Sequence, residues 1–242
     1  MSNIKLITPI SRRDLLRVAV PKGTASYSPV PHKKVIELTL EQLDKAGLKV
    51  LSEAYHMARN GNQARGSYEI GIKDKEMHLK LAWHNSYDKT MPVRWAMGAH
   101  IIVCENGMVV GDLGIFKRRH TGTVLEDYAE TIKEHILQAG SMFDTLKNER
   151  EQMKNIDIDS RTRAELIGRM FLEDKILTST QLGIIRDEIE NPSYGDYGAP
   201  GTIWELYNHG TVGMKQDHPT SYIDHHIKYH NFFRKEFKLE TV

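Results

Sequence analysis

The chain has 242 residues, of which 40% are hydrophobic and 27% charged, with a formal net charge of +1 and a single cysteine, Cys104. This length and composition are typical of a globular protein with a sizeable core, and no run approaches the roughly 18 apolar residues that a membrane span needs. One cysteine excludes an intramolecular disulfide and a thiolate metal cluster, so we expect Cys104 to be a core residue. The first residues, "MSNIKLITPISRRDLL", contain no secretory signal pattern, and we expect a cytoplasmic protein.

The small net charge hides an uneven distribution. Residues 1–123 contain 19 Lys plus Arg against 11 Asp plus Glu, a balance of +8, whereas residues 124–242 have a balance of −7. The first half is therefore suited to face a polyanion and the second half is not. The alternative is that the split is accidental patterning of surface charge.

The first predicted elements are a helix and a sheet. Pro29 and Pro31 disfavour helix, and apolar residues from Val35 to Ala46 then recur at helical intervals until Gly47. From about residue 50 the apolar period changes to two, which predicts four or five antiparallel strands. These strands are expected at residues 50–60, 66–72, 76–85, 93–105 and 108–116. Asn106-Gly107 predicts a type I′ turn that makes residues 99–105 and 108–116 a hairpin, because both central positions of this turn need positive φ.

Helices are predicted for the rest of the chain. Thr123 and Glu126 have capping-box spacing, and an apolar seam from Leu125 to Met153 predicts one helix of roughly thirty residues. The seam could pack on the sheet or on a second copy of the chain, and the sequence leaves both open. Further helices are predicted at residues 160–190, with a break near Thr178, and, after a loop at 191–202, at 203–214 and 219–237.

Together these elements predict an α+β protein, with an antiparallel β-sheet, a long helix packed on it and a helical C-terminal part. We expect a domain at residues 1–155, with a basic sheet and the long helix, and a helical extension at residues 156–242. No clean linker separates the two.

Common catalytic motifs are missing from the sequence. It contains no phosphate loop, no G-x-G-x-x-G after a strand, no G-x-S-x-G and no H-E-x-x-H. This disfavours an ATPase, a dinucleotide-dependent enzyme, a serine hydrolase and a zincin, respectively. His226 and His230 are four residues apart and could hold a metal with Asp217 or Asp224, as in a metal-dependent hydrolase. Only two clear ligands would share that helix face, so we favour ordinary helix histidines and expect no metal, no cofactor and no enzyme activity.

Basic and aromatic residues alternate in the strand region. Bases stack on aromatic rings while Lys and Arg follow phosphates, although each aromatic residue alone could equally be a core residue. A basic run also lies between the last strand and the long helix, where the N–H groups that begin a helix favour an anion. The pattern predicts a nucleic-acid interface formed by Arg65, Lys80, Trp83, Lys89, Arg94, Lys117, Arg118, Arg119 and His120, with Trp95, Tyr68 and Tyr87 as further candidates for stacking.

Five strings carry a family resemblance: "SYSPVPHKKVIELTLEQLDKAGL", "HNSYDKT", "VCENGMVV", "RRHTG" and "TIWELYNHGTVGM". On these strings the chain resembles the phage/plasmid-like proteins collected as the domain of unknown function numbered nine hundred and thirty-two. The family's usual Asn-Ser-His-Asp reads Asn85-Ser86-Tyr87-Asp88 here, which puts a role for the usual histidine in doubt. The resemblance implies a phage or plasmid origin but no established reaction.

The order of helix, antiparallel strands and long helix also looks like the core of phage single-strand annealing proteins of the Redβ, RecT and Erf groups, an analogy of arrangement only. The leading hypothesis is a phage protein that binds DNA, single-stranded in particular, and self-assembles as a homo-oligomer through its helices. It would act in annealing during recombination or replication. The alternative is a phage-encoded interaction protein that binds a host protein through its acidic helical half.

Overall fold

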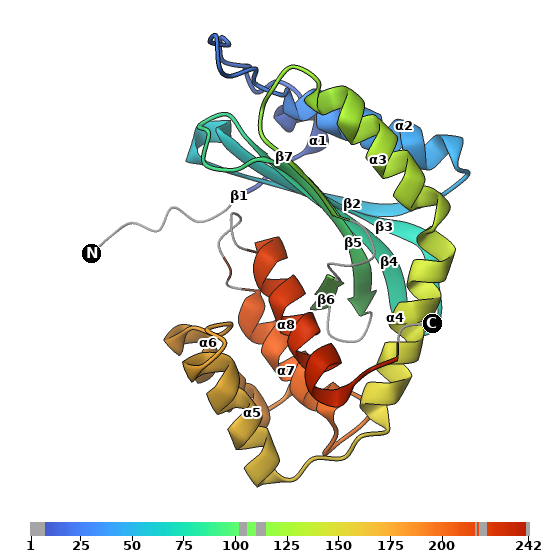
Figure 1. The fold of residues 1–242 in the computed structure, drawn as a ribbon, viewed down its shortest axis with the longest axis vertical. Helices are drawn as coiled ribbons and strands as arrows, with labels where there is room; N and C mark the ends of the chain where they lie inside the picture. The colour runs from blue at the N-terminus through green and yellow to red at the C-terminus, as the bar shows by residue number, and fades with distance from the viewer. Residues whose placement is uncertain (1–7, 102–105, 110–114, 216, 218–221, 241–242) are drawn as a thin grey trace. The chain divides into compact units, whose positions relative to one another are not determined.

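A computed structural model describes residues 8–101, 106–109, 115–215, 217 and 222–240 (Figure 1). The fold is α+β, as the sequence predicts. The chain divides into two compact units. The first unit consists of Met1–Lys73, His78–Met97 and Asp112–Gly140, and the second of Asp74–Met77, Gly98–Gly111 and Ser141–Val242. Residues 141–155, expected in the first domain, thus group with the second unit.

One antiparallel sheet runs through the strand region, as the period of two predicts. Its strands follow the order β1-β2-β3-β4-β5-β6, and β7 also pairs with β5. The strands are β1 (Thr8–Pro9), β2 (Val50–Ala58), β3 (Gln63–Lys73), β4 (Met77–Ser86), β5 (Val93–Ile101), β6 (Asn106–Val109) and β7 (Ile115–Arg118). A short 3₁₀ turn, η1 (Arg59–Gly61), joins β2 to β3.

The helices of the first unit are α1 (Arg12–Leu15), α2 (His32–Lys45) and α3 (Val124–Leu137). The prediction of α2 is confirmed. Gly47 has a φ of +69°, and the Leu48 N–H donates to the Leu43 carbonyl at 2.9 Å, which ends the helix in a Schellman motif. In Figure 1, α2 and α3 lie side by side over one face of the sheet, and Thr39 of α2 is 2.7 Å from the Tyr128 hydroxyl of α3.

The predicted hairpin turn is wrong. Asn106 and Gly107 lie inside β6, where they pair with Ile101 and His100 of β5. The connection between the two strands is therefore residues 102–105. These residues, Cys104 among them, lie outside the described residues. β5 pairs first with β7, over Val93–Ala96, and then with β6, over Gly98–Ile101. Pairing with two successive partners sets this register, and it overrides the local preference of Asn-Gly for a turn.

The prediction of a single long helix is also wrong. α3 ends at Leu137, Gln138 has a φ of −95° and a ψ of 2°, and α4 (Ala139–Lys154) begins at the next residue. Gly140, which weakens a helix interior, lies next to this break. The Thr123 side chain makes no capping bond, and its backbone oxygen instead accepts from the Glu126 and Asp127 N–H groups at 3.1 Å.

The apolar seam is buried within a single copy of the chain. It therefore no longer supports the prediction of a homo-oligomer. Its most buried members, all at most 4% exposed, are Ile132, Ile136, Ala139, Phe143, Leu146 and Met153.

Replacing Ile136 by glutamate should therefore unfold the protein rather than separate copies of it. Ile136 is 4% exposed, and a buried unpaired charge should lower the free energy of unfolding by at least about 3 kcal/mol. Its neighbour Leu137 is 74% exposed, so Leu137→Glu is the matched control, with a change within about 0.5 kcal/mol. Thermal melts and size-exclusion chromatography measure both effects. A folded Ile136→Glu protein of smaller size would show instead that the seam joins copies.

The second unit holds the predicted C-terminal helices, which are confirmed. They are α5 (Ser160–Leu172), α6 (Ser179–Glu190), α7 (Ile203–Met214) and α8 (Tyr222–Phe237). The break near Thr178 is confirmed too, because Thr178 and Gln181 form a reciprocal capping box at the start of α6. The predicted loop at 191–202 contains a short strand, β8 (Ser193–Asp196). Within the described part of the chain, no helix has the length and apolar character of a membrane span.

Candidate nucleic-acid interface

The sheet of the first unit has two chemically different faces. One face, here called the helix face, packs on α3, where the Phe116 and Tyr128 rings lie 5.3 Å apart and the Trp95 ring lies 5.1 Å from His135. Trp83 belongs to the same face, since its indole N–H donates to the Tyr68 hydroxyl at 3.3 Å. Because successive side chains of a strand point to opposite faces, the residues between these aromatics point the other way.

The second face, here called the basic face, collects basic side chains from five neighbouring strands. Residues directly opposite each other in an antiparallel pair share a face. The register pairs His56 with Arg65 and Arg65 with His84, Glu69 with Lys80, and Arg94 with Lys117. The basic face thus consists of His56, Arg65, Lys80, His84, Arg94 and Lys117.

Members of the basic face differ in exposure. Lys117 is exposed and Arg65, Lys80 and His56 are partly exposed, whereas Arg94 and His84 are each only 3% exposed. The carboxylate of Glu69 shares this face and lies 3.5 Å from His78. Burial, together with the charges of Arg65 and Lys80, lowers the pKa of His56. The side chains that a phosphate could reach are therefore Arg65, Lys80 and Lys117, while Arg94 adds positive charge behind them.

The tryptophans lie outside the interface that the sequence predicts for them. Trp83 is 1% exposed, and its indole packs against the Gly66 backbone so closely that a Cβ there would lie 2.6 Å from the ring. Trp95 and Tyr68 are each 0% exposed. Burial on the helix face makes these rings unavailable for stacking on bases.

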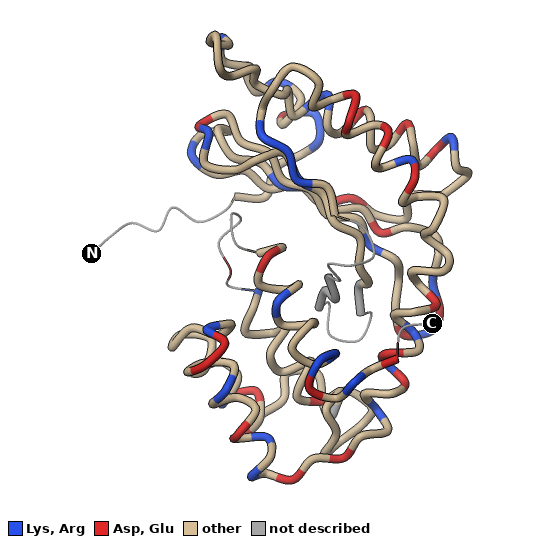
Figure 2. The backbone as a smooth tube through the Cα atoms, viewed as in Figure 1, with Lys and Arg blue, Asp and Glu red and all other residues tan. Residues whose placement is uncertain are grey.

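The side chains of the predicted run Lys117–His120 do not share one face of the sheet. Figure 2 marks the Lys and Arg positions along the backbone. Lys117 points to the basic face, but Arg118 points to the helix face, where its guanidinium lies 3.4 Å from Asp127. Asp127 and Glu126 occupy the first turn of α3, which disfavours an anion at this helix start. Arg119 is exposed beyond the end of β7.

His120 and Lys89 have other surroundings. His120 is 5% exposed, and its Nδ1 accepts from the Val30 N–H while its Nε2 donates to the Met91 carbonyl, both at 3.3 Å. Burial lowers the pKa of His120, so the ring is a neutral structural group rather than a phosphate contact. Lys89 is exposed in the β4–β5 connection, with its Nζ 4.8 Å from the centre of the Tyr27 ring.

A buried polar network joins the strings that carry the family resemblance. His32, which the sequence analysis did not single out, is 1% exposed; its Nε2 donates to the Gly61 carbonyl and its Nδ1 accepts from the Asn85 amide, both at 2.9 Å. Tyr87, which stands at the departure from the family's usual string, stacks on His32 at 4.0 Å between ring centres. Its hydroxyl accepts from the His32 N–H at 2.8 Å. Both ring nitrogens of His32 have partners, so this network anchors α2 to β4.

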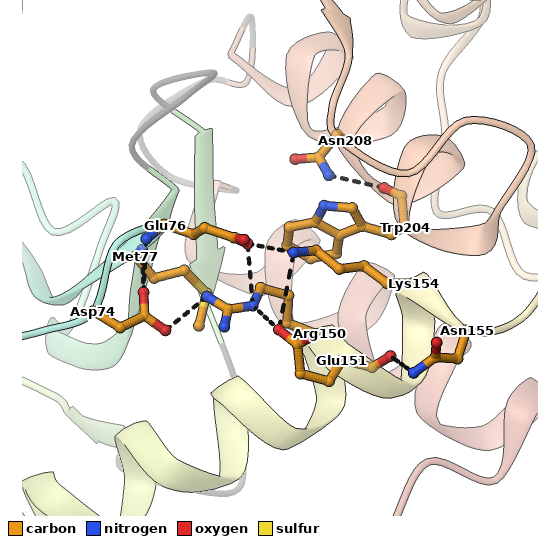
Figure 3. Close-up of polar contacts among 9 residues, drawn as sticks. All are labelled: Asp74, Glu76, Met77, Arg150, Glu151, Lys154, Asn155, Trp204 and Asn208. Atoms are coloured by element: carbon orange, nitrogen blue, oxygen red, sulfur yellow. Dashed lines mark hydrogen bonds and ion pairs between the residues drawn. The ribbon is translucent and has the colours of Figure 1, made fainter.

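The charged groups at the C-terminal end of α4 in the second unit are paired with charged groups of the β3–β4 turn and with one another (Figure 3). Arg150, 7% exposed, forms an ion pair with Asp74 at 2.8 Å from Nη1 and donates a hydrogen bond from Nε to Glu151 at 2.7 Å, and Lys154 pairs with Glu76. Asp74 also accepts the N–H groups of Glu76 and Met77 at 2.8 Å each. Because both cations have carboxylate partners in this network, we assign it the role of holding the β3–β4 turn on α4.

The C-terminal histidines take part in separate networks. His230 is fully buried, 3.0 Å from Glu149 and 3.1 Å from the Tyr207 hydroxyl. Asp217 instead bonds the Gln181 amide at 2.7 Å and His225 at 3.2 Å. Over the ranges that the structure describes, no group of three or more His, Cys, Asp or Glu residues could hold a metal ion. The metal-dependent hydrolase therefore gains no support from this region.

Comparison with known proteins gives a family. The family model described as "Domain of unknown function (DUF932)" matches residues 23–225. Searches of curated proteins and of solved structures found no match.

Proposed function

Since this chain belongs to the family of the domain of unknown function DUF932, whose description assigns no reaction, we propose from the basic face that it is a DNA-binding protein. It holds single-stranded DNA through the phosphates, without a cofactor and without catalysing a reaction. The observation that carries the proposal is the register, which brings Arg65, Lys80, Arg94 and Lys117 to one face of the sheet.

The dimensions of the basic face suit a single strand. Its members lie on β2, β3, β4, β5 and β7, and neighbouring strands are about 4.8 Å apart, so the row is about 20 Å long. A single strand can bend to follow such a row, whereas major-groove recognition of duplex DNA uses an inserted helix or two-stranded ribbon. With the tryptophans buried, affinity comes from the phosphates and should depend little on base sequence.

Phage origin and a role in annealing extend the same proposal. The support for them is the family resemblance and the order of the elements. Annealing requires several protein copies on one strand, so it is a consequence of strand binding to be tested after it.

Salt dependence of binding tests the proposal. Each phosphate contact releases condensed counterions, so a log–log plot of affinity against salt should have a slope of about −0.7 per contact, or about −2 for the three accessible cations. Anisotropy of a labelled oligothymidine, with a duplex of equal length as the comparison, measures this slope at several salt concentrations. An absence of binding at low salt would refute the proposal and favour the host-protein alternative, in which the acidic second half is the working surface.

A further inference from the structure

His56 lies among cations on the basic face, although no sequence motif marks it. It is on β2 directly opposite Arg65, which is in turn opposite His84 on β4. On its other side β1 contributes Pro9, which carries no charge. Lys80 of β4 is close enough to affect the charge of the imidazole, and the carboxylate of this face, Glu69, lies across from Lys80 and next to His78.

We propose that His56 is a further phosphate-binding residue, which contacts the bound strand as an imidazolium, so that DNA binding takes up a proton. This inference rests on the proposed function. It adds a ligand-binding residue and a dependence on pH that charge composition alone does not predict, because His56 counts as neutral at pH 7.

The electrostatics of the site explain the coupling. In the unoccupied protein, Arg65 and Lys80 repel a proton on His56, and burial adds to this effect, so the pKa of His56 lies below its ordinary value. A phosphate among the three groups compensates the two permanent charges and accepts a hydrogen bond from the imidazolium. Both effects raise the pKa of His56 in the complex.

The sign of the pH dependence follows by linkage. Because the complex holds the proton more tightly than the unoccupied protein, binding strengthens as the pH falls from the pKa of the complex to that of the unoccupied protein. Outside that window the affinity should be independent of pH. Within it the dissociation constant should fall by up to about tenfold per pH unit, the limit for uptake of one proton.

The experiment is a titration of labelled oligothymidine at fixed ionic strength between about pH 5 and about pH 8, where neither thymine nor a phosphodiester titrates. The parent protein should bind more tightly at the lower pH, and the NMR titration of the His56 imidazole should shift to higher pH when the oligonucleotide is bound. His56→Gln, which keeps a polar side chain without the charge, should bind as the parent does at high pH and lose most of the gain at low pH.

His78→Gln is the matched control. His78 lies on the same face but next to Glu69, so its replacement should leave the pH dependence in place. Binding that is equally tight at all pH values, or a pH dependence that survives in a folded His56→Gln protein, would refute the role of His56 and leave the proposed function standing. No binding at any pH would refute the proposed function itself.

Discussion

Replacing Lys117 by alanine should weaken single-strand binding about tenfold at low salt, whereas replacing its neighbour Arg118 should change it by less than about twofold. A charge-assisted contact to phosphate contributes about 1.5 kcal/mol, which corresponds to that factor of ten. Lys117 is on the basic face opposite Arg94, but Arg118 is on the helix face beside Asp127. The two variants remove the same charge from adjacent positions.

Salt dependence separates a lost contact from a general loss of charge. Lys117→Ala should reduce the magnitude of the log–log slope by about 0.7, and the combined replacement of Arg65, Lys80 and Lys117 by about 2. Lys33→Ala with Lys34→Ala, which removes two exposed charges from α2, should leave the slope unchanged. Partly or fully exposed side chains contribute little to packing, so unfolding midpoints should stay near that of the parent. Equal effects of Lys117→Ala and Arg118→Ala would show that net charge, not the basic face, determines binding.

Elements whose signals lie within one stretch of sequence could be predicted. α2 has an amphipathic period and ends at Gly47, where a positive φ costs least, and α6 begins with a capping box at Thr178. Both features arise from residues at most a few positions apart. The turn before β6 depends on the pairing of β5 with β7 and β6, so the local Asn-Gly signal predicts it wrongly. The break at Gln138 has a local signal in Gly140, but the continuous apolar seam predicts an unbroken helix.

The candidate site shows the same limit. Composition identifies the excess of cations, but only the faces of the strands show which cations lie together. The alternation of β4 already carried this signal: Leu79, Leu81 and Trp83 share one parity and are buried, while Lys80 has the other. His56 could have been placed by the same argument from its neighbour Tyr55, whereas the pairing of Arg94 with Lys117 requires the register of β5 and β7.

Acid should destabilise the first unit through His32. Burial, with a smaller contribution from the neighbouring His120, lowers the pKa of His32 to about 4 from an ordinary value near 6.5. The Nδ1 of His32 accepts a hydrogen bond from the Asn85 amide. Protonation of Nδ1 would replace this bond by a repulsive contact between two N–H groups. The folded protein therefore resists a proton that the unfolded chain accepts.

The sign and size follow from the two pKa values. Above about pH 6.5 both states hold a neutral His32 and the stability is fully present; it is lost as the pH falls towards about 4. The total loss is about 3 kcal/mol, since each pKa unit corresponds to about 1.4 kcal/mol. His120, whose pKa is also lowered by burial, should add to the loss in the same direction.

Urea unfolding at a series of pH values between about 7.5 and about 4, followed by circular dichroism, measures this effect. His32→Gln should be less stable than the parent at neutral pH, because it loses the stacking on Tyr87 and the bond to the Gly61 carbonyl. Its stability should nevertheless fall by about 3 kcal/mol less across the acid range, because no proton is excluded at position 32. An acid loss as steep as that of the parent would show that other groups, and not His32, set the sensitivity to acid.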